Sequence, residues 1–304
     1  MAKNSFDKSA LLIVNPVSGK KAVFKFLPQI IRRFMDEGYI VTTMVTGGHG
    51  DAEEFAAKYG PEYDLICCTG GDGTLNQTLS GIAKAGLNVP LGYIPCGSTN
   101  DFALAHGLSS DIMQAAERIL TADCSTYDIG RFGDRYFSYV AAFGAFSWLS
   151  YTTDQNLKNL LGHTAYVLSG ISELSQIRKE HVRMEIDGEV VEDDFLFGAI
   201  SNSTSVGGVL TLDPRRVDLK DGKFELLLVR VPKDMTELSE CITALRNQEY
   251  DCKVITFRSV SRLTVYPEPG MAWTLDGEKD DGGEEIRIEN LTKAIRLIRR
   301  EDRK

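Results

Sequence analysis

A glycine-rich segment holds the residues best suited to phosphate chemistry. Residues 65–68 (LICC) form an apolar, strand-like run, and TGGDGTLN at residues 69–76 follows directly. Three glycines in four positions let main-chain N–H groups approach an anion, and the positive end of the following helix would face its charge. Asp72 would repel phosphate unless a magnesium ion lay between them. The segment therefore indicates a site for a magnesium nucleotide, with an ordinary strand-to-helix turn as the alternative.

Polar segments also follow three other strand-like runs. The runs and their segments are residues 10–14 and 15–21, 39–45 and 46–51, and 91–94 and 95–101. Helix-like periodicity comes after each segment, so four strand-loop-helix units predict an α/β domain with a parallel sheet covered by helices. Ligands of such sheets bind outside the carboxyl ends of the strands, where all four loops are expected.

The first of these loops is not a P-loop. That motif would need glycine at position 14 and serine or threonine at position 21, where Val14 and Lys21 stand. The Asn-Pro-x-Ser-Gly pattern at residues 15–19 is either part of a phosphate site or a loop with a helix cap. Thr46 likewise either hydrogen-bonds a nucleotide or closes a turn.

The pattern changes after Cys124 to short alternating segments with turn signals, such as residues 131–137 and 184–191. These predict antiparallel hairpins and a mainly β second domain. One helical pattern interrupts it at about residues 154–178, and its leucine-rich stripe predicts a core-facing helix or, alternatively, a lipid-entry helix.

Two acidic segments lie in this second half, DLKDGK at residues 218–223 and LDGE at residues 275–278. Each contains Asp-Gly, which alone predicts a turn. Because residues 273–275 look strand-like, the carboxylates of Asp276 and Glu278 would point to one side of a strand. That arrangement suits a general base and its electrostatic partner.

Composition narrows the classes of function. The chain has 304 residues, 43% of them hydrophobic and 25% charged, with a net charge of −9, which is typical of a soluble globular protein and argues against general nucleic-acid binding. It lacks an apolar run of about 18 residues, so membrane contact would be peripheral. Six cysteines without CxxC spacing predict reduced thiols in the cytoplasm. The four histidines show no metal-ligand spacing. The basic residues of 293–304 predict a solvated tail or a contact with an anionic membrane.

Five motifs in order along the chain resemble the diacylglycerol-kinase catalytic-domain family, specifically the soluble bacterial lipid kinases. They are residues 15–19, 70–76, 95–101, 218–222 and 275–278. GGDGT also occurs in phosphofructokinase-like and NAD kinases, but the ordered set ending in LDGE is more specific. The resemblance implies an N-terminal α/β nucleotide domain of phosphofructokinase and NAD-kinase type and a C-terminal β-sandwich, with ATP and lipid in the cleft between them. We expect the domains at residues 1–125 and 126–289, with about 290–304 packing back on the first.

The resemblance also assigns roles to individual residues. Glu278 would accept a proton with Asp276 beside it, and Asp72 would bind magnesium together with ATP. Asp218, Asp221 and the carbonyl of Lys223 would form a second, structural magnesium site, although Lys220 and Lys223 stand where neutral or acidic residues are usual. Ser98 replaces the family's common threonine and keeps its hydroxyl. The implied nucleotide contacts are Asn15, Pro16, Ser18, Gly19, Thr46, Gly70, Gly71, Asp72, Gly73, Thr74, Leu75, Asn76, Ser98, Asn100 and Asp101.

The expected function is transfer of the γ-phosphoryl group of ATP, with Mg²⁺, to a lipid hydroxyl, with diacylglycerol as the family's default acceptor and phosphatidic acid as its product. The alternatives are a kinase of a soluble acceptor, such as NAD or a sugar phosphate, and a nucleotide-binding regulator without turnover. Phe143, Phe146, Trp148 and Leu149 favour a lipid. The expected partner is a lipid at the inner face of the membrane. No nucleic-acid partner is expected, and the chain forms either a monomer or a homodimer.

Overall fold

The computed structural model describes residues 6–21, 23–98, 100–144, 179–206, 210–250 and 252–299. The chain divides into two compact units, one made of Met1–Asp128 with Thr292–Lys304 and the other of Ile129–Leu291. The helix predicted at residues 154–178, together with Phe146, Trp148 and Leu149, lies outside the described residues.

The first unit is built on a parallel sheet. Its strands are β2 (Tyr39–Val45), β1 (Lys8–Val14), β3 (Leu65–Gly70) and β4 (Pro90–Pro95), in that order. β1 and β3 are buried almost throughout, as their continuous apolar sequences require in a sheet that is covered on both faces. The predicted α/β class is therefore confirmed.

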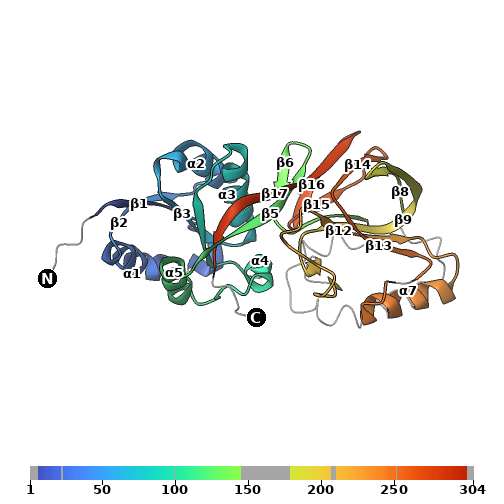
Figure 1. Cartoon of the computed structure of the whole chain (residues 1–304), viewed down its shortest axis with the longest axis horizontal. Coiled ribbons are helices and arrows are strands. Elements are labelled where there is room, and N and C mark those ends of the chain that lie inside the picture. The colour runs from blue at the N-terminus through green and yellow to red at the C-terminus, as the bar shows by residue number, and fades with distance from the viewer. Residues whose placement is uncertain are drawn as a thin grey trace. The chain divides into compact units, whose positions relative to one another are not determined.

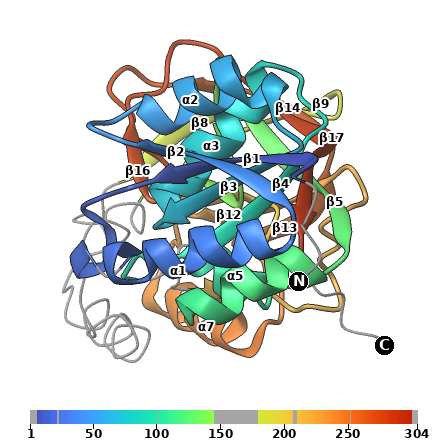
Figure 2. The same cartoon turned by 90° about the vertical axis from the view of Figure 1, so that its left-hand side faces the viewer.

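Helices cover both faces of this sheet. Figure 2 shows α2 (Asp51–Tyr59) and α3 (Asp72–Lys84) on one face and α1 (Val23–Asp36) and α5 (Ile112–Thr121) on the other. α1 buries a stripe of Val23, Ile30 and Phe34 against the apolar residues of the sheet and of α5. Short helices occupy Ser18–Lys21, Gly60–Glu62 and α4 (Asp101–Ala105).

The second unit is mainly antiparallel β structure (Figure 1). Both predicted hairpins are confirmed: β5 pairs with β6, and β8 pairs with β9 across the Asp187-Gly188 turn, where both residues have positive φ. β9 also pairs with β7 and β12, and α7 (Met235–Asn247) follows β12. The strands are β5 (Cys124–Phe132), β6 (Arg135–Phe137), β7 (Val140–Gly144), β8 (Glu180–Ile186), β9 (Glu189–Ser201), β10 (Ser205–Val206), β11 (Leu210–Thr211), β12 (Phe224–Arg230), β13 (Ile255–Val260), β14 (Arg262–Pro267), β15 (Trp273–Leu275), β16 (Glu278–Asp280) and β17 (Ile286–Ile298).

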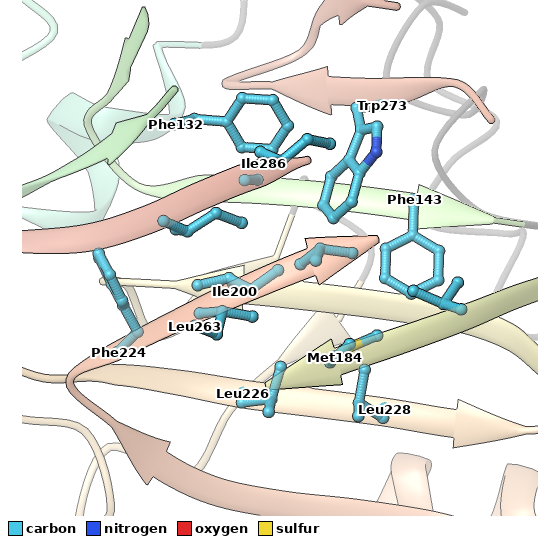
Figure 3. Packing of buried hydrophobic residues seen from close by; sticks show 14 of the residues in the cluster. Phe132, Phe143, Met184, Ile200, Phe224, Leu226, Leu228, Leu263, Trp273 and Ile286 are labelled. Atoms are coloured by element: carbon cyan, nitrogen blue, oxygen red, sulfur yellow. The ribbon is translucent and has the colours of Figure 1, made fainter. Parts of the chain in front are cut away.

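Aromatic side chains pack together in the core of the second unit (Figure 3). The ring of Trp273 lies 5.0 Å from that of Phe132 and 4.9 Å from that of Phe143, measured between centroids. Phe143 is completely buried in this cluster. The interpretation of Phe143 as part of a lipid groove is therefore wrong, because alternation along β7 turns its side chain into the core.

The basic C-terminal residues are not a tail as far as position 299. Ile295 and Leu297 are buried and Arg296 lies between them on β17, whose second half runs parallel to β4. Arg296 donates from Nη1 to the carbonyl of Asn88, and Arg299 from Nη1 to the carbonyl of His106. Residues 300–304 lie outside the description.

We predict that Trp273→Ala lowers the free energy of unfolding by about 3–5 kcal/mol, because it removes a large, fully buried side chain and leaves a cavity. Urea denaturation of the whole chain measures the effect. Val190→Ala, at a position that is 55% exposed, serves as the control and should stay within about 0.5 kcal/mol of wild type. A Trp273→Ala variant as stable as this control would contradict the packing described.

Candidate active site

The four polar loops of the first unit begin at one edge of its sheet. Val14 pairs with Val45 on one side and with Thr69 on the other, and Thr69 pairs with Ile94. The four strands therefore end level, and their carboxyl ends face the same way. This register brings together the loops that the sequence predicted to meet.

Glycines allow three of these loops to touch main chain to main chain. A Cβ atom on Gly19, whose φ is +53°, would lie 1.8 Å from the carbonyl oxygen of Cys96. A Cβ on Gly97 would lie 2.6 Å from the Cα atom of Gly71. The predicted glycines thus have a packing role that comes before any contact with a ligand.

Asparagine side chains fasten the same loops. Asn15 donates from Nδ2 to the hydroxyl of Thr74 at 2.8 Å. Asn100, with φ of +54°, accepts from the N–H of Gly97 at 2.8 Å and donates back to its carbonyl at 3.0 Å. The Asn100 contacts are local, as Asn side chains commonly make in turns, whereas Asn15 joins the first loop to α3.

Asp72 binds the start of α4. Its Oδ2 accepts from the N–H of Asp101 at 3.0 Å and its Oδ1 from the N–H of Phe102 at 3.2 Å. The carboxylate predicted to bind magnesium therefore also ties the glycine turn to the next loop. Burial and the nearby charge of Asp72 raise the pKa of Asp101 above its usual range.

Other predicted nucleotide contacts differ in accessibility. Leu75 is completely buried and packs into the interior from α3, so its nucleotide contact stays a prediction. Thr46 is also buried and donates from its N–H to the carbonyl of Val14 at 2.9 Å. Ser98 is exposed, and Pro16 and Ser18 are partly exposed.

The LDGE segment of the second unit is a hairpin turn and not a continuous strand. Leu275 pairs with Glu278, and Asp276 and Gly277 between them have φ of +50° and +86°. The prediction that Asp276 and Glu278 share one side of a strand is therefore wrong. Asp-Gly adopts positive φ at both central positions of a two-residue hairpin loop, which breaks the alternation.

Asp276 is almost fully buried and accepts four hydrogen bonds. Its Oδ2 accepts from the N–H and the hydroxyl of Ser138 at 2.5 and 2.8 Å, and its Oδ1 from the N–H groups of Tyr139 and Val140 at 3.0 Å each. Burial raises the pKa of this carboxyl above its usual range, and the four donors offset only part of that rise. Asp276 thus fixes the hairpin against residues 138–140.

Glu278 begins β16 and remains partly exposed. The Nη2 atom of Arg135 lies 3.6 Å from its Oε2, while Nη1 of the same arginine lies 2.6 Å from Oδ2 of Asp280. Sequence reasoning missed both Arg135 and Ser138. No local pattern reveals them, because 145 residues separate Arg135 from Asp280 along the chain.

The second acidic segment forms two local turns. Asp218 accepts from the N–H of Lys220 at 3.1 Å and Asp221 from the N–H of Lys223 at 3.0 Å. The carbonyl of Lys223 accepts from Nδ2 of Asn290 at 3.0 Å. Within the described part of the chain, no group of three His, Cys, Asp or Glu side chains is arranged to hold a metal ion. The second magnesium site stays a prediction.

Glu225 is a buried acid that sequence reasoning also missed. It is 1% exposed on β12, and neither carboxylate oxygen has a hydrogen-bond partner among the residues that the structure describes. Burial, reinforced by the charge of Asp221, raises its pKa to about 8. A glutamate inside the apolar run FELLLV was the available signal.

Comparison with known proteins identifies the family. Residues 9–132 match the diacylglycerol kinase catalytic domain, and residues 147–299 match the YegS C-terminal NAD kinase beta sandwich-like domain. The diacylglycerol kinase of Bacillus subtilis (strain 168) is 34% identical over 273 residues, which cover 89% of this chain and 90% of that protein. The chain belongs to the diacylglycerol-kinase family. The diacylglycerol kinase of Staphylococcus saprophyticus is 33% identical over 273 residues, covering 89% of each protein.

Solved structures share the fold of this family member. Two solved structures of a putative diacylglycerol kinase from Bacillus anthracis str. Sterne superpose with TM-scores of 0.76 and 0.77 at 23% identity. The matches cover 96% of this chain and 96% and 97% of theirs. An α/β domain followed by a β-rich domain is therefore the fold of this chain, as its resemblance to the family predicted.

We predict that Gly19→Ala lowers the free energy of unfolding by about 1–3 kcal/mol, because the left-handed backbone is strained and the added methyl meets the Cys96 carbonyl. Gly48→Ala in a neighbouring loop is the matched control, since a Cβ there meets nothing within 4 Å and φ is not positive. Urea titrations compare the two variants. Equal stabilities would show that the loops do not need this close approach.

We predict that Glu225 makes stability depend on pH. The folded chain keeps the proton up to about pH 8, whereas the unfolded chain releases it near the ordinary value of 4.5. Stability should therefore fall as pH rises between these values and level off above about pH 8. The melting temperature of Glu225→Gln, measured beside wild type with EDTA present, should lack this component. Parallel curves for both proteins would contradict it.

Proposed function

We propose that this chain is an ATP-dependent lipid kinase that phosphorylates the hydroxyl of diacylglycerol to give phosphatidic acid. Its family membership and the names of its relatives support this activity. The observation that carries the proposal is the pairing of two sets of groups in one chain. The first unit has glycine loops at the carboxyl edge of a parallel sheet, and the second has a partly exposed glutamate on a rigid hairpin.

The first unit suits a magnesium nucleotide. Residues 70–76 place a glycine turn at the start of α3, where main-chain N–H groups and the helix dipole favour phosphate oxygens. Asp72 and Asp101 add carboxylate oxygens, which are the ligands that Mg²⁺ prefers. These residues, with Asn15 and Ser18 beside them, would hold the nucleotide. Bound magnesium would neutralise charge on the phosphates.

Glu278 is the proposed proton acceptor. The acceptor hydroxyl passes its proton to this carboxylate as its oxygen bonds to the γ-phosphorus, and the bond from phosphorus to the ADP oxygen breaks. Asp276 is buried and its two oxygens already accept hydrogen bonds, so we assign it the support of the hairpin rather than proton transfer. This assignment keeps the role that the resemblance implies for Glu278 and gives Asp276 a supporting one.

A lipid alcohol fits the hairpin better than NAD or a sugar phosphate does. Asp276, Glu278 and Asp280 bring three carboxyl groups to this turn, and the neighbouring cation Arg135 pairs with two of them. Such surroundings disfavour an acceptor that carries its own phosphate, whereas the glycerol hydroxyl of diacylglycerol has no charge to repel. The soluble-acceptor kinase therefore becomes the second candidate.

Access to the lipid would require peripheral contact with the inner face of the membrane. Within the described ranges, no helix is long and apolar enough to cross a bilayer. Arg296 and Arg299 are engaged by main-chain carbonyls, so the cations beyond residue 299 are the better candidates for contact with anionic lipid. A second magnesium ion at Asp218, Asp221 and the Lys223 carbonyl remains part of the proposal.

We predict that substitution of Glu278 lowers turnover, whereas substitution of Asp276 lowers stability. Glu278→Gln should lower kcat on diacylglycerol by about a hundred- to ten-thousandfold while leaving the melting temperature and ATP affinity unchanged. Asp276→Asn should lower the free energy of unfolding by about 1–3 kcal/mol, because an amide turns an N–H₂ group toward a main-chain donor.

The assay follows transfer of radiolabelled phosphate from ATP to diacylglycerol, to a total lipid extract and to NAD. Transfer to NAD alone would support the second candidate, and no transfer to any acceptor would support a regulator without turnover. A Glu278→Gln variant that retains wild-type turnover would remove Glu278 from the chemistry.

A further inference from the structure

We propose that Arg135 is a positioning residue that holds Glu278 in the orientation needed for proton transfer. The proposal rests on the function assigned to Glu278 above. Residues 135–140 contact the hairpin of β15 and β16 at two points. At one end, Ser138, Tyr139 and Val140 bind Asp276 in the turn. At the other end, Arg135 reaches the two acidic side chains of β16.

The guanidinium group of Arg135 bridges two carboxylates on one face of a strand. Glu278 and Asp280 flank Lys279 on β16, so their side chains leave the strand on the same side. Arg135 contacts Asp280 at 2.6 Å through Nη1 and approaches Glu278 at 3.6 Å through Nη2. Asp280 thus fixes the planar guanidinium group, whose second nitrogen faces Glu278.

The main chain of Arg135 is itself well fixed. It pairs with Phe132 across the turn of the β5–β6 hairpin, where Gly133 has φ of +56°. The N–H of Gly133 donates to the carbonyl of Arg287 at 2.9 Å, which ties this turn to β17. A rigid base matters because small displacements of a reacting group can lower a rate by about a hundredfold.

A purely structural role fits the surroundings poorly. The side chains of Arg135 and Glu278 are 42% and 35% exposed. The side chain of Asp280 is 12% exposed, but ion pairs of an arginine this exposed contribute little to folding, so the loss of Arg135 should leave the chain folded. Direct binding of phosphate also fits poorly, because the guanidinium already faces two carboxylates and would have to leave them.

A double-mutant cycle tests the proposal. Arg135→Ala should lower kcat on diacylglycerol by about ten- to a hundredfold with KM for ATP unchanged. In a Glu278→Gln background the same change should lower kcat by less than about twofold, because a residue that acts through Glu278 has nothing left to position. Arg135→Lys should restore part of the rate, since it keeps a cation near Asp280.

Arg131→Ala is the matched control. Arg131 lies on β5, in the same hairpin, and pairs with Glu289 at a similarly exposed position. It should leave kcat and KM near wild type. Melting temperatures of all five variants show whether each chain is folded before kinetics are compared.

Three results would overturn the proposal while leaving the kinase intact. In the first, Arg135→Ala lowers kcat by the same factor with and without Glu278. In the second, a rise in KM for ATP accounts for the whole loss of activity. In the third, Arg135→Ala is unfolded, and Arg135→Lys is folded but no more active than Arg135→Ala. A wild-type chain that phosphorylates no lipid would instead remove the proposed function, and the role of Arg135 with it.

Discussion

A buried carboxylate holds the acidic hairpin of the second unit in place. Asp276 gives up water on burial, which is unfavourable for a charged group, and four hydrogen bonds from residues 138–140 offset part of that loss. Because three of the donors are main-chain N–H groups, the Asp276 side chain holds the main chain of residues 138–140 beside the hairpin turn. The position of Glu278, two residues further on, follows from this contact together with the turn.

Asp72 has a similar place in the first unit. It accepts from two main-chain N–H groups at the start of α4, and so joins the glycine turn to the loop that carries Asp101. In both units, the aspartate next to a glycine organises the main chain, and a nearby acid, Asp101 or Glu278, is the one proposed for chemistry. Each motif therefore contains acids of two kinds. Substitution of the supporting aspartate should lower stability, and substitution of the acid proposed for chemistry should lower turnover.

The sequence was most informative where structure follows from local patterns. Continuous apolar runs ending in polar loops predicted the parallel sheet and its level carboxyl edge, because parallel strands place such loops together. The turn signal in residues 184–191, which contain Asp-Gly, predicted the β8–β9 hairpin. The glycines of residues 70–76 were recognised, but their packing against Gly97 was not, since that contact depends on two loops meeting in space.

The remaining errors have physical causes of the same kind. Two-residue alternation placed Asp276 and Glu278 on one face, but positive φ at Asp276 and Gly277 interrupts the strand. The basic C-terminal residues suggested a tail, although Ile295 and Leu297 alternate with them as in a strand that is buried on one side. Arg135 carried no local signal, because its partners lie on a strand far along the chain. Long-range pairing of charges is a tertiary property.

The charges around Glu278 bear on which acceptor the chain can use. At a separation of about 4 Å, two unit charges interact by about 1 kcal/mol in water and about 4 kcal/mol near a protein surface. Because Arg135 is shared between Glu278 and Asp280, it cannot neutralise both carboxylates and an incoming phosphate together. An uncharged hydroxyl meets no such repulsion. The carboxylates around the proposed base would therefore favour neutral alcohols. Removal of Arg135 would weaken the orientation of Glu278 and, because a positive charge is lost, would increase the repulsion of a charged acceptor.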